Sequence, residues 1–94
     1  MATPSANWDL SKPWTIPAET LVLYRTPREW RFAVANVAGG IIDGRLIDTT
    51  VDAPVASAMA ELVRRTAEAT GRSYVANWTS DTPDWWSATL EDVT

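Results

Sequence analysis

The sequence contains no histidine and no cysteine, and its single lysine is Lys12. It therefore lacks the commonest acid–base catalyst, the thiol nucleophile and the usual ligands of transition metals. The absence of cysteine also excludes a disulfide framework. Because Lys12 lies in an irregular stretch, a serine–lysine catalytic pair is disfavoured as well. We expect a protein that is not an enzyme, with no catalytic residue, no metal site and no cofactor.

The 94 residues include 12 acidic and 8 basic side chains, for a net charge of −4. This sign disfavours sequence-independent binding to nucleic acid and to anionic membranes. No apolar run approaches the ~18 residues of a membrane span, and the first residues do not form a signal peptide. We expect a cytoplasmic protein with no membrane association. So short a chain forms one small domain, for which a homodimer is a natural way to bury more surface.

Basic residues are almost all arginine, seven of eight, and alanine, valine, threonine and aspartate are abundant. This bias is typical of a GC-rich bacterium or its phage. It is an expectation about the source and does not bear on function.

A helical period is clear only in residues 52–71. Apolar positions there form one stripe: Val55, Met59, Leu62, Val63 and Thr66. The polar positions predicted to face solvent are Ser57, Glu61, Arg64, Arg65 and Glu68. Asp52 is the expected N-cap, Pro54 suits the first turn, and Gly71 suits the end. The sequence therefore predicts an amphipathic helix, with i,i+4 ion pairs Glu61–Arg65 and Arg64–Glu68 on its outer face.

Five further segments have the composition of strands: residues 19–26, 30–38, 41–51, 73–79 and, as an optional fifth strand, 85–90. The predicted fold is α+β: an antiparallel meander of four to five strands in the order β-β-β-α-β, possibly with a further β, and one amphipathic helix packed on one face. Residues 1–18, with tryptophan and proline, are predicted to form an extended arm, and residues 19–94 a single domain.

Two hairpin registers follow from the predicted turns. In the first hairpin, opposed residues sum to 55, which pairs Leu23 with Phe32. A two-residue turn at Gly39-Gly40 would make the second hairpin sum to 79, pairing Arg31 with Asp48, and would place a bulge or bend at Asp43-Gly44.

Both faces of the predicted meander are apolar. One face holds Leu21, Leu23, Trp30, Phe32, Val34 and Ile47, and the other holds Val22, Tyr24, Ala33, Ala35, Val37, Ile42 and Leu46. We expect the helix on the first, bulkier face. The second face then needs another cover: the arm, a second copy of the chain, or a partner.

Six tryptophans are the main oddity of composition. Trp30 and Trp78 are expected in the core. Trp85 and Trp86 are neighbours in a strand, so their side chains face opposite ways and at least one lies at the surface. The predicted partner-binding residues are Trp85, Trp86, Trp14, Trp8 and Tyr24, because tryptophan and tyrosine are enriched in binding hot spots.

Three functions remain open. The first is a non-enzymatic interaction protein that binds a protein partner, or itself, through this tryptophan-rich surface. The second is a carbohydrate-binding module in which Trp85, Trp86 and Trp14 stack on sugar rings. The third is a single-stranded nucleic-acid-binding module, which would require a cluster of basic side chains: Arg25, Arg28, Arg31 and Arg45.

The predicted order strand-strand-strand-helix-strand over residues 19–79, with Asp48-Thr49-Thr50 leading into the helix, resembles the small domain of HicB-type antitoxins. This resemblance implies an acidic inhibitor that neutralises a basic toxin, which is a variant of the first function.

Overall fold

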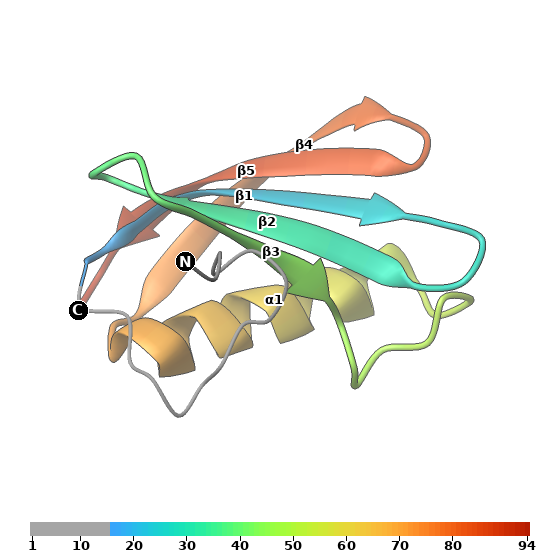
Figure 1. Ribbon diagram of the computed structural model, residues 1–94, viewed down its shortest axis with the longest axis horizontal. Coiled ribbons are helices and arrows are strands. Elements are labelled where there is room, and N and C mark those ends of the chain that lie inside the picture. Colours follow the sequence, from blue (N-terminus) through green and yellow to red (C-terminus); the bar gives the residue numbers. More distant parts are fainter. Residues whose placement is uncertain (1–15) are drawn as a thin grey trace, which may run out of the picture.

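The computed structural model describes residues 16–94. Three strands precede the helix and two follow it: β1 Ala18–Arg25, β2 Trp30–Asn36, β3 Ile41–Arg45, α1 Val55–Thr70, β4 Tyr74–Thr82 and β5 Trp85–Asp92. The strands form one antiparallel sheet of order β3-β2-β1-β5-β4, and α1 lies on one face of it (Figure 1). The predicted α+β fold is confirmed, including its fifth strand. Most of the predicted arm falls outside the described residues.

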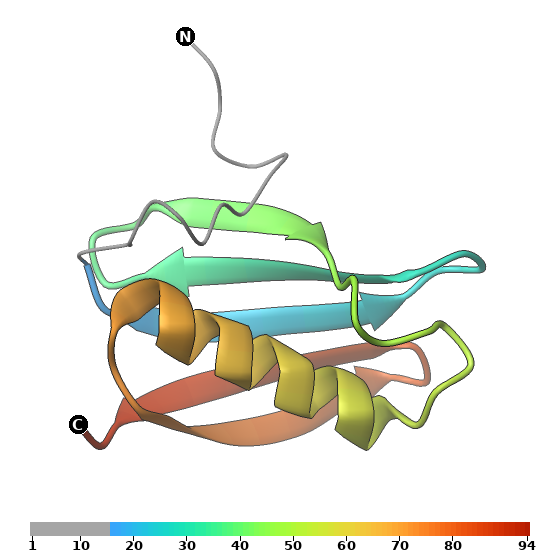
Figure 2. The same cartoon turned by 90° about the horizontal axis from the view of Figure 1, so that it is seen from below.

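The core lies between α1 and the bulkier face of the sheet, as the sequence predicts. Figure 2 shows the helix running across this face. The strands contribute Leu21, Leu23, Trp30, Phe32 and Val34, each no more than 2% exposed, and the helix contributes Leu62 and Ala58. Trp30 is fully buried and Trp78 packs against the edge of this core. The opposite face of the sheet carries no helix among the described residues.

The first hairpin has the predicted register. Leu23 lies opposite Phe32, Leu21 opposite Val34 and Val22 opposite Ala33. Thr26 closes the turn, because its hydroxyl and amide both bond to the carbonyl of Glu29, at 2.8 and 2.9 Å.

The second hairpin does not have the predicted register. Arg31 pairs with Arg45 and not with Asp48. The turn is earlier and longer than two residues, because Asn36 pairs with Gly40 around residues 37–39. The Asn36 side chain causes this shift: its Oδ1 accepts bonds from the amides of Ala38 and Gly40, at 2.9 and 2.8 Å. Of Gly39 and Gly40, only Gly39 takes a positive φ, at 89°.

As a consequence, β3 ends at Arg45, before the predicted strand does. Gly44 stays in the ladder opposite Phe32 with a regular register, so the predicted bulge or bend at Asp43-Gly44 is wrong. Position 44 favours glycine because there is little room for a side chain: a Cβ at Gly44 would lie 3.3 Å from the Phe32 ring. The shift also exchanges two apolar side chains: Leu46 is buried, whereas Ile47, predicted in the core, is 69% exposed.

The helix begins at Val55 and its N-cap is Pro54, with no side-chain cap bond. The predicted capping role of Asp52 is therefore wrong. The predicted end is confirmed: Gly71 is left-handed, with φ 67°, and its amide bonds to the carbonyl of Ala67.

Glu61 and Arg65 form the predicted i,i+4 pair, at 3.5 Å, but the prediction that they face solvent is wrong. They are 5% and 8% exposed. The loop of residues 46–54 folds against this side of the helix, and the Glu61 carboxylate accepts bonds from the amides of Ile47 and Asp48 and from the hydroxyl of Thr49. The pair Arg64–Glu68, at 3.3 Å, is exposed as predicted.

The last two strands form a hairpin with a turn at Pro83-Asp84 and an irregular register between Ser80 and Thr82. In the described part of the chain, no helix has the length and apolarity that crossing a membrane requires.

Candidate functional site

The face of the sheet opposite α1, called here the open face, carries a row of large side chains. In antiparallel strands, directly opposed residues share a face. The registers pair Arg45 with Arg31, Arg31 with Tyr24, and Tyr24 with Trp85. These four side chains therefore form a continuous row across β3, β2, β1 and β5, called here the arginine–aromatic row.

Tyr24 and Trp85 stack within this row. Their ring centroids are 4.4 Å apart and their planes differ by 15°. Trp85 keeps 41% of its surface exposed. Such a pair is rigid and presents a large apolar area with two polar handles, the tyrosine hydroxyl and the indole N–H.

The two arginines of the row share one carboxylate, that of Glu29 in the turn before β2. The nitrogen–oxygen distances are 2.6 Å from Arg31 and 3.6 Å from Arg45. The hydrogen bond from Arg31, together with the two positive charges, holds the pKa of Glu29 below its ordinary value against the opposing effect of desolvation. Hydrogen bonds to Glu29 and Tyr24 raise the pKa of Arg31. The short bond holds Arg31 beside the stacked rings, whereas the Arg45 side chain, which is 66% exposed, is held less firmly.

Beside the row, the open face is hollowed, and most of the residues that line this hollow are threonine, serine or alanine. The hollow has a volume of about 190 Å³ and lies over β1, β5 and β4. Its lining comprises Thr20, Leu21, Val22, Asn77, Thr79, Ser87, Ala88 and Thr89. Short side chains of this kind let another molecule approach the backbone of the sheet.

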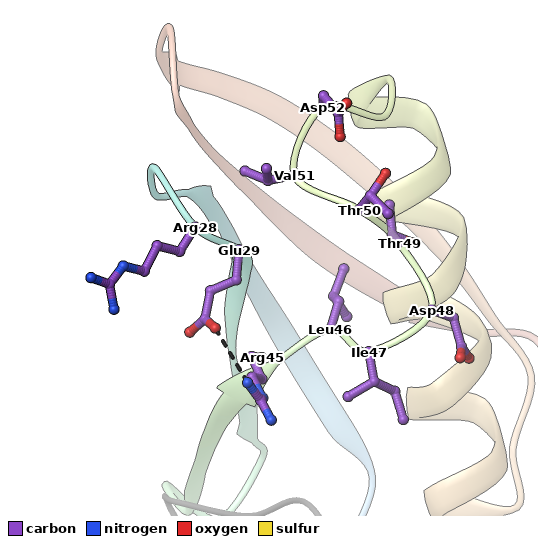
Figure 3. Close-up of a pocket in the computed structure, with 10 residues that line it drawn as sticks. All are labelled: Arg28, Glu29, Arg45, Leu46, Ile47, Asp48, Thr49, Thr50, Val51 and Asp52. Atoms are coloured by element: carbon purple, nitrogen blue, oxygen red, sulfur yellow. Dashed lines mark ion pairs between the residues drawn. The ribbon is translucent and has the colours of Figure 1, made fainter.

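A second hollow, of about 550 Å³, lies between the turn before β2 and the loop that precedes α1. Figure 3 shows its lining: Arg28, Glu29, Arg45, Leu46, Ile47, Asp48, Thr49, Thr50, Val51 and Asp52. Arg28 extends away from the loop, and Arg45 pairs with Glu29. The charged groups of this hollow do not converge on one point, so we consider it the weaker candidate.

The predicted binding residues are separated by the fold. Tyr24 and Trp85 meet on the open face. Trp86 faces the helix side, where its ring centroid lies 5.7 Å from that of Trp30. The prediction that neighbouring Trp85 and Trp86 face opposite ways is confirmed. Trp8 and Trp14 lie outside the described residues.

The four arginines considered for nucleic-acid binding do not gather. Arg31 and Arg45 lie in the row, whereas Arg25 lies on the helix side, 4.3 Å above the Trp30 ring, and donates to the carbonyl of Val51. The predicted register did not place Arg45 beside Arg31. Asn36 is the residue from which this neighbourhood could have been predicted, because its side chain sets the hairpin register that brings Arg31 and Arg45 together.

Within residues 16–94, no group of three or more aspartate, glutamate, histidine or cysteine side chains is placed to hold a metal ion.

Comparison with known proteins gave no match to a family model, to a curated protein or to a solved structure. The resemblance to HicB-type antitoxins thus gains no support from these comparisons.

Proposed function

We propose that this chain is a non-enzymatic interaction domain that binds a protein partner through the open face of its sheet. The observation that carries this proposal is the arginine–aromatic row, in which Arg45, Arg31, Tyr24 and Trp85 stand side by side across four strands. Tyrosine, tryptophan and arginine are the residues most enriched in hot spots of protein interfaces.

Two further properties of the row support this function. Three of its four side chains are held in place, by the Tyr24–Trp85 stack and by the 2.6 Å bond between Arg31 and Glu29, so their ordering adds little to the entropy cost of binding. The adjoining hollow, of about 190 Å³, offers room for a partner's side chain or backbone.

Single-stranded nucleic acid is the second candidate ligand. Arg31 and Arg45 adjoin the stacked rings, and bases bind to surfaces that combine cations with aromatic rings. Against this, Glu29 already neutralises part of the positive charge, Asp43 lies opposite Ala33 on the same face, and the net charge is −4. The balance of charge favours a protein.

Carbohydrate binding has less support. Sugars bind to flat aromatic faces that are open to solvent, and here Tyr24 and Trp85 each cover one face of the other. Trp86, the other aromatic proposed for sugar stacking within the described residues, lies on the helix side.

Affinity capture with matched variants tests the proposal. The wild-type chain, Trp85→Ser and Val37→Ser would each be immobilised and exposed to a lysate of a GC-rich bacterium. Val37 is 59% exposed and lies in the turn after β2, at the other end of that strand from Arg31, so its variant controls for loss of a surface hydrophobe. We expect the wild type and Val37→Ser to retain the same protein, and Trp85→Ser to retain at least about tenfold less.

A titration of tryptophan emission with an oligothymidylate distinguishes the second candidate. Quenching that weakens as salt rises would favour nucleic acid. If no retained protein depends on Trp85, the proposed protein-binding function is wrong.

A further inference from the structure

The sheet has two edges, and only one of them is protected. Edge strands carry unpaired backbone groups, which natural proteins usually shield with charges, prolines, bulges or short length. The β3 edge spans five residues and carries Asp43 and Arg45. The β4 edge spans nine residues, and from 74 to 80 it has no charge and no proline. Its irregular register begins only after Ser80.

The hydrogen bonds identify the backbone groups that face outward from β4. Val93 N–H donates to the carbonyl of Ser73 at 2.9 Å, so this opposed pair is a hydrogen-bonded one. In an antiparallel ladder such pairs alternate, so Val75, Asn77 and Thr79 bond to β5. The N–H and C=O groups of the even-numbered residues therefore point away from the sheet: Tyr74, Ala76, Trp78 and Ser80. None of them has a backbone partner among the described residues.

We propose that the β4 edge pairs with the β4 edge of a second copy of this chain, antiparallel, around a two-fold axis at Asn77. This register opposes Ala76 to Trp78 of the second copy and Tyr74 to its Ser80, and so satisfies all four outward-facing residues. We infer a second copy as the occupant because residues 74 to 80 complement themselves in this antiparallel register: the two strands have the same length, and neither brings a charge to the contact.

Side chains in this register are compatible on both faces. On the open face, Val75 meets Thr79 of the second copy, and no like charges are opposed. On the helix side, the small Ala76 lies against Trp78 of the second copy, which covers an indole that each separate domain leaves half-buried.

The dimer is independent of the protein-binding function proposed above. Because the two-fold axis is perpendicular to the sheet, both helices lie on one side and both open faces on the other. The product is a ten-stranded sheet that carries two arginine–aromatic rows on one surface.

The test uses two lysine substitutions on the exposed face of β4. In the proposed register, Asn77→Lys places two lysines directly opposite each other across the axis, with Cα atoms about 4.5 Å apart. Thr79→Lys adds the same charge to the same face, but opposite Val75 of the second copy. We expect the dissociation constant of the dimer to rise at least about tenfold for Asn77→Lys and by less than about threefold for Thr79→Lys.

Light scattering and sedimentation across a concentration series measure these constants, and circular dichroism checks that each variant is folded. A third variant, Ala76→Pro, removes an outward-facing N–H and leaves the hydrogen bonds between β4 and β5 intact, so it is expected to yield a monomer. A wild type that stays monomeric at several hundred micromolar would overturn the proposal. Equal effects of the two lysine variants, or a dimer that dissociates only when Trp85 or Tyr24 is replaced, would also overturn it.

Discussion

Glu61 accepts two backbone amides of the preceding loop and the hydroxyl of Thr49, and it lies 3.5 Å from the guanidinium of Arg65. Its carboxylate thus substitutes for the water that the loop amides would otherwise need. The helical period alone assigns Glu61 to the solvent face, because periodicity records which side chains are polar and not which loop folds over them.

Replacement of Glu61 by alanine is expected to lower the free energy of unfolding by about 3 kcal/mol, because it leaves the buried Arg65 guanidinium with the Arg45 carbonyl but no carboxylate, and removes the acceptor of two half-buried loop amides. Glu68→Ala is the matched control: its pair with Arg64 is exposed, and its loss is expected to cost about 0.5 kcal/mol or less. Urea unfolding of both variants measures the difference. Equal costs would show that Glu61 does not tie the loop to the helix.

The Glu29 cluster predicts a dependence of stability on pH. The bond from Arg31 holds the pKa of Glu29 below its ordinary 4.5 in the folded chain. A lowered pKa contributes stability above the unfolded value, and this contribution is lost as the pH falls through the folded value. Urea unfolding at pH values from neutral to 3 is therefore expected to show a stability loss below about 4.5 that is smaller in Glu29→Gln.

Some acid sensitivity remains in that variant, because bonds from Thr94 and Arg72 lower the pKa of Asp92 as well. Identical pH profiles for the wild type and Glu29→Gln would contradict the role of the Glu29 cluster.

The registers and ends of some elements could be predicted from the sequence, chiefly where the order of apolar and polar residues shows which side chains are buried. The first hairpin register followed from Leu21, Leu23, Phe32 and Val34, whose apolar side chains must share one face. The end of the helix followed from Gly71. The adjacent tryptophans at 85 and 86 had to face opposite ways, and they do.

The second hairpin could not be predicted from its glycines. Both Gly39 and Gly40 suit a positive φ, but the side chain of Asn36 decides which of them takes it. The resulting register moves Arg45 beside Arg31, so one of the four residues of the candidate site depended on an asparagine at the end of a strand. Cross-strand sites of this kind are lost when one turn is misplaced.

Gly39→Ala tests this turn. Nothing lies within 4 Å of a Cβ added at Gly39, so its cost comes from the backbone φ of 89° alone. We expect a loss of about 1 kcal/mol in the free energy of unfolding. Val37→Ala, at a side chain that is 59% exposed, is the control and is expected to change stability by about 0.5 kcal/mol or less. If Gly39→Ala left the free energy of unfolding unchanged, Gly39 would not have a positive φ and the turn would lie elsewhere.

For the whole molecule, one sheet offers three different surfaces. The helix covers one face, the second face carries the arginine–aromatic row, and the β4 edge, which has no charge from 74 to 80, ends the sheet on one side. The row and the edge do not overlap, because Tyr24 and Trp85 lie on β1 and β5 and the outward-facing groups belong to β4. Self-association through the edge therefore leaves the row accessible to a partner.

Amide hydrogen exchange distinguishes the monomer from the proposed dimer residue by residue. The amides of Val75 and Asn77 bond to β5 in both states, so they are expected to exchange slowly at every protein concentration. The amides of Ala76 and Trp78 point away from β5, and only a second copy would protect them. We expect their protection to rise at least about tenfold where light scattering gives a dimer, and to be lost in Asn77→Lys while Val75 stays protected. If Ala76 and Trp78 exchange rapidly in a sample that is dimeric by mass, the two copies meet elsewhere and the β4 edge is free.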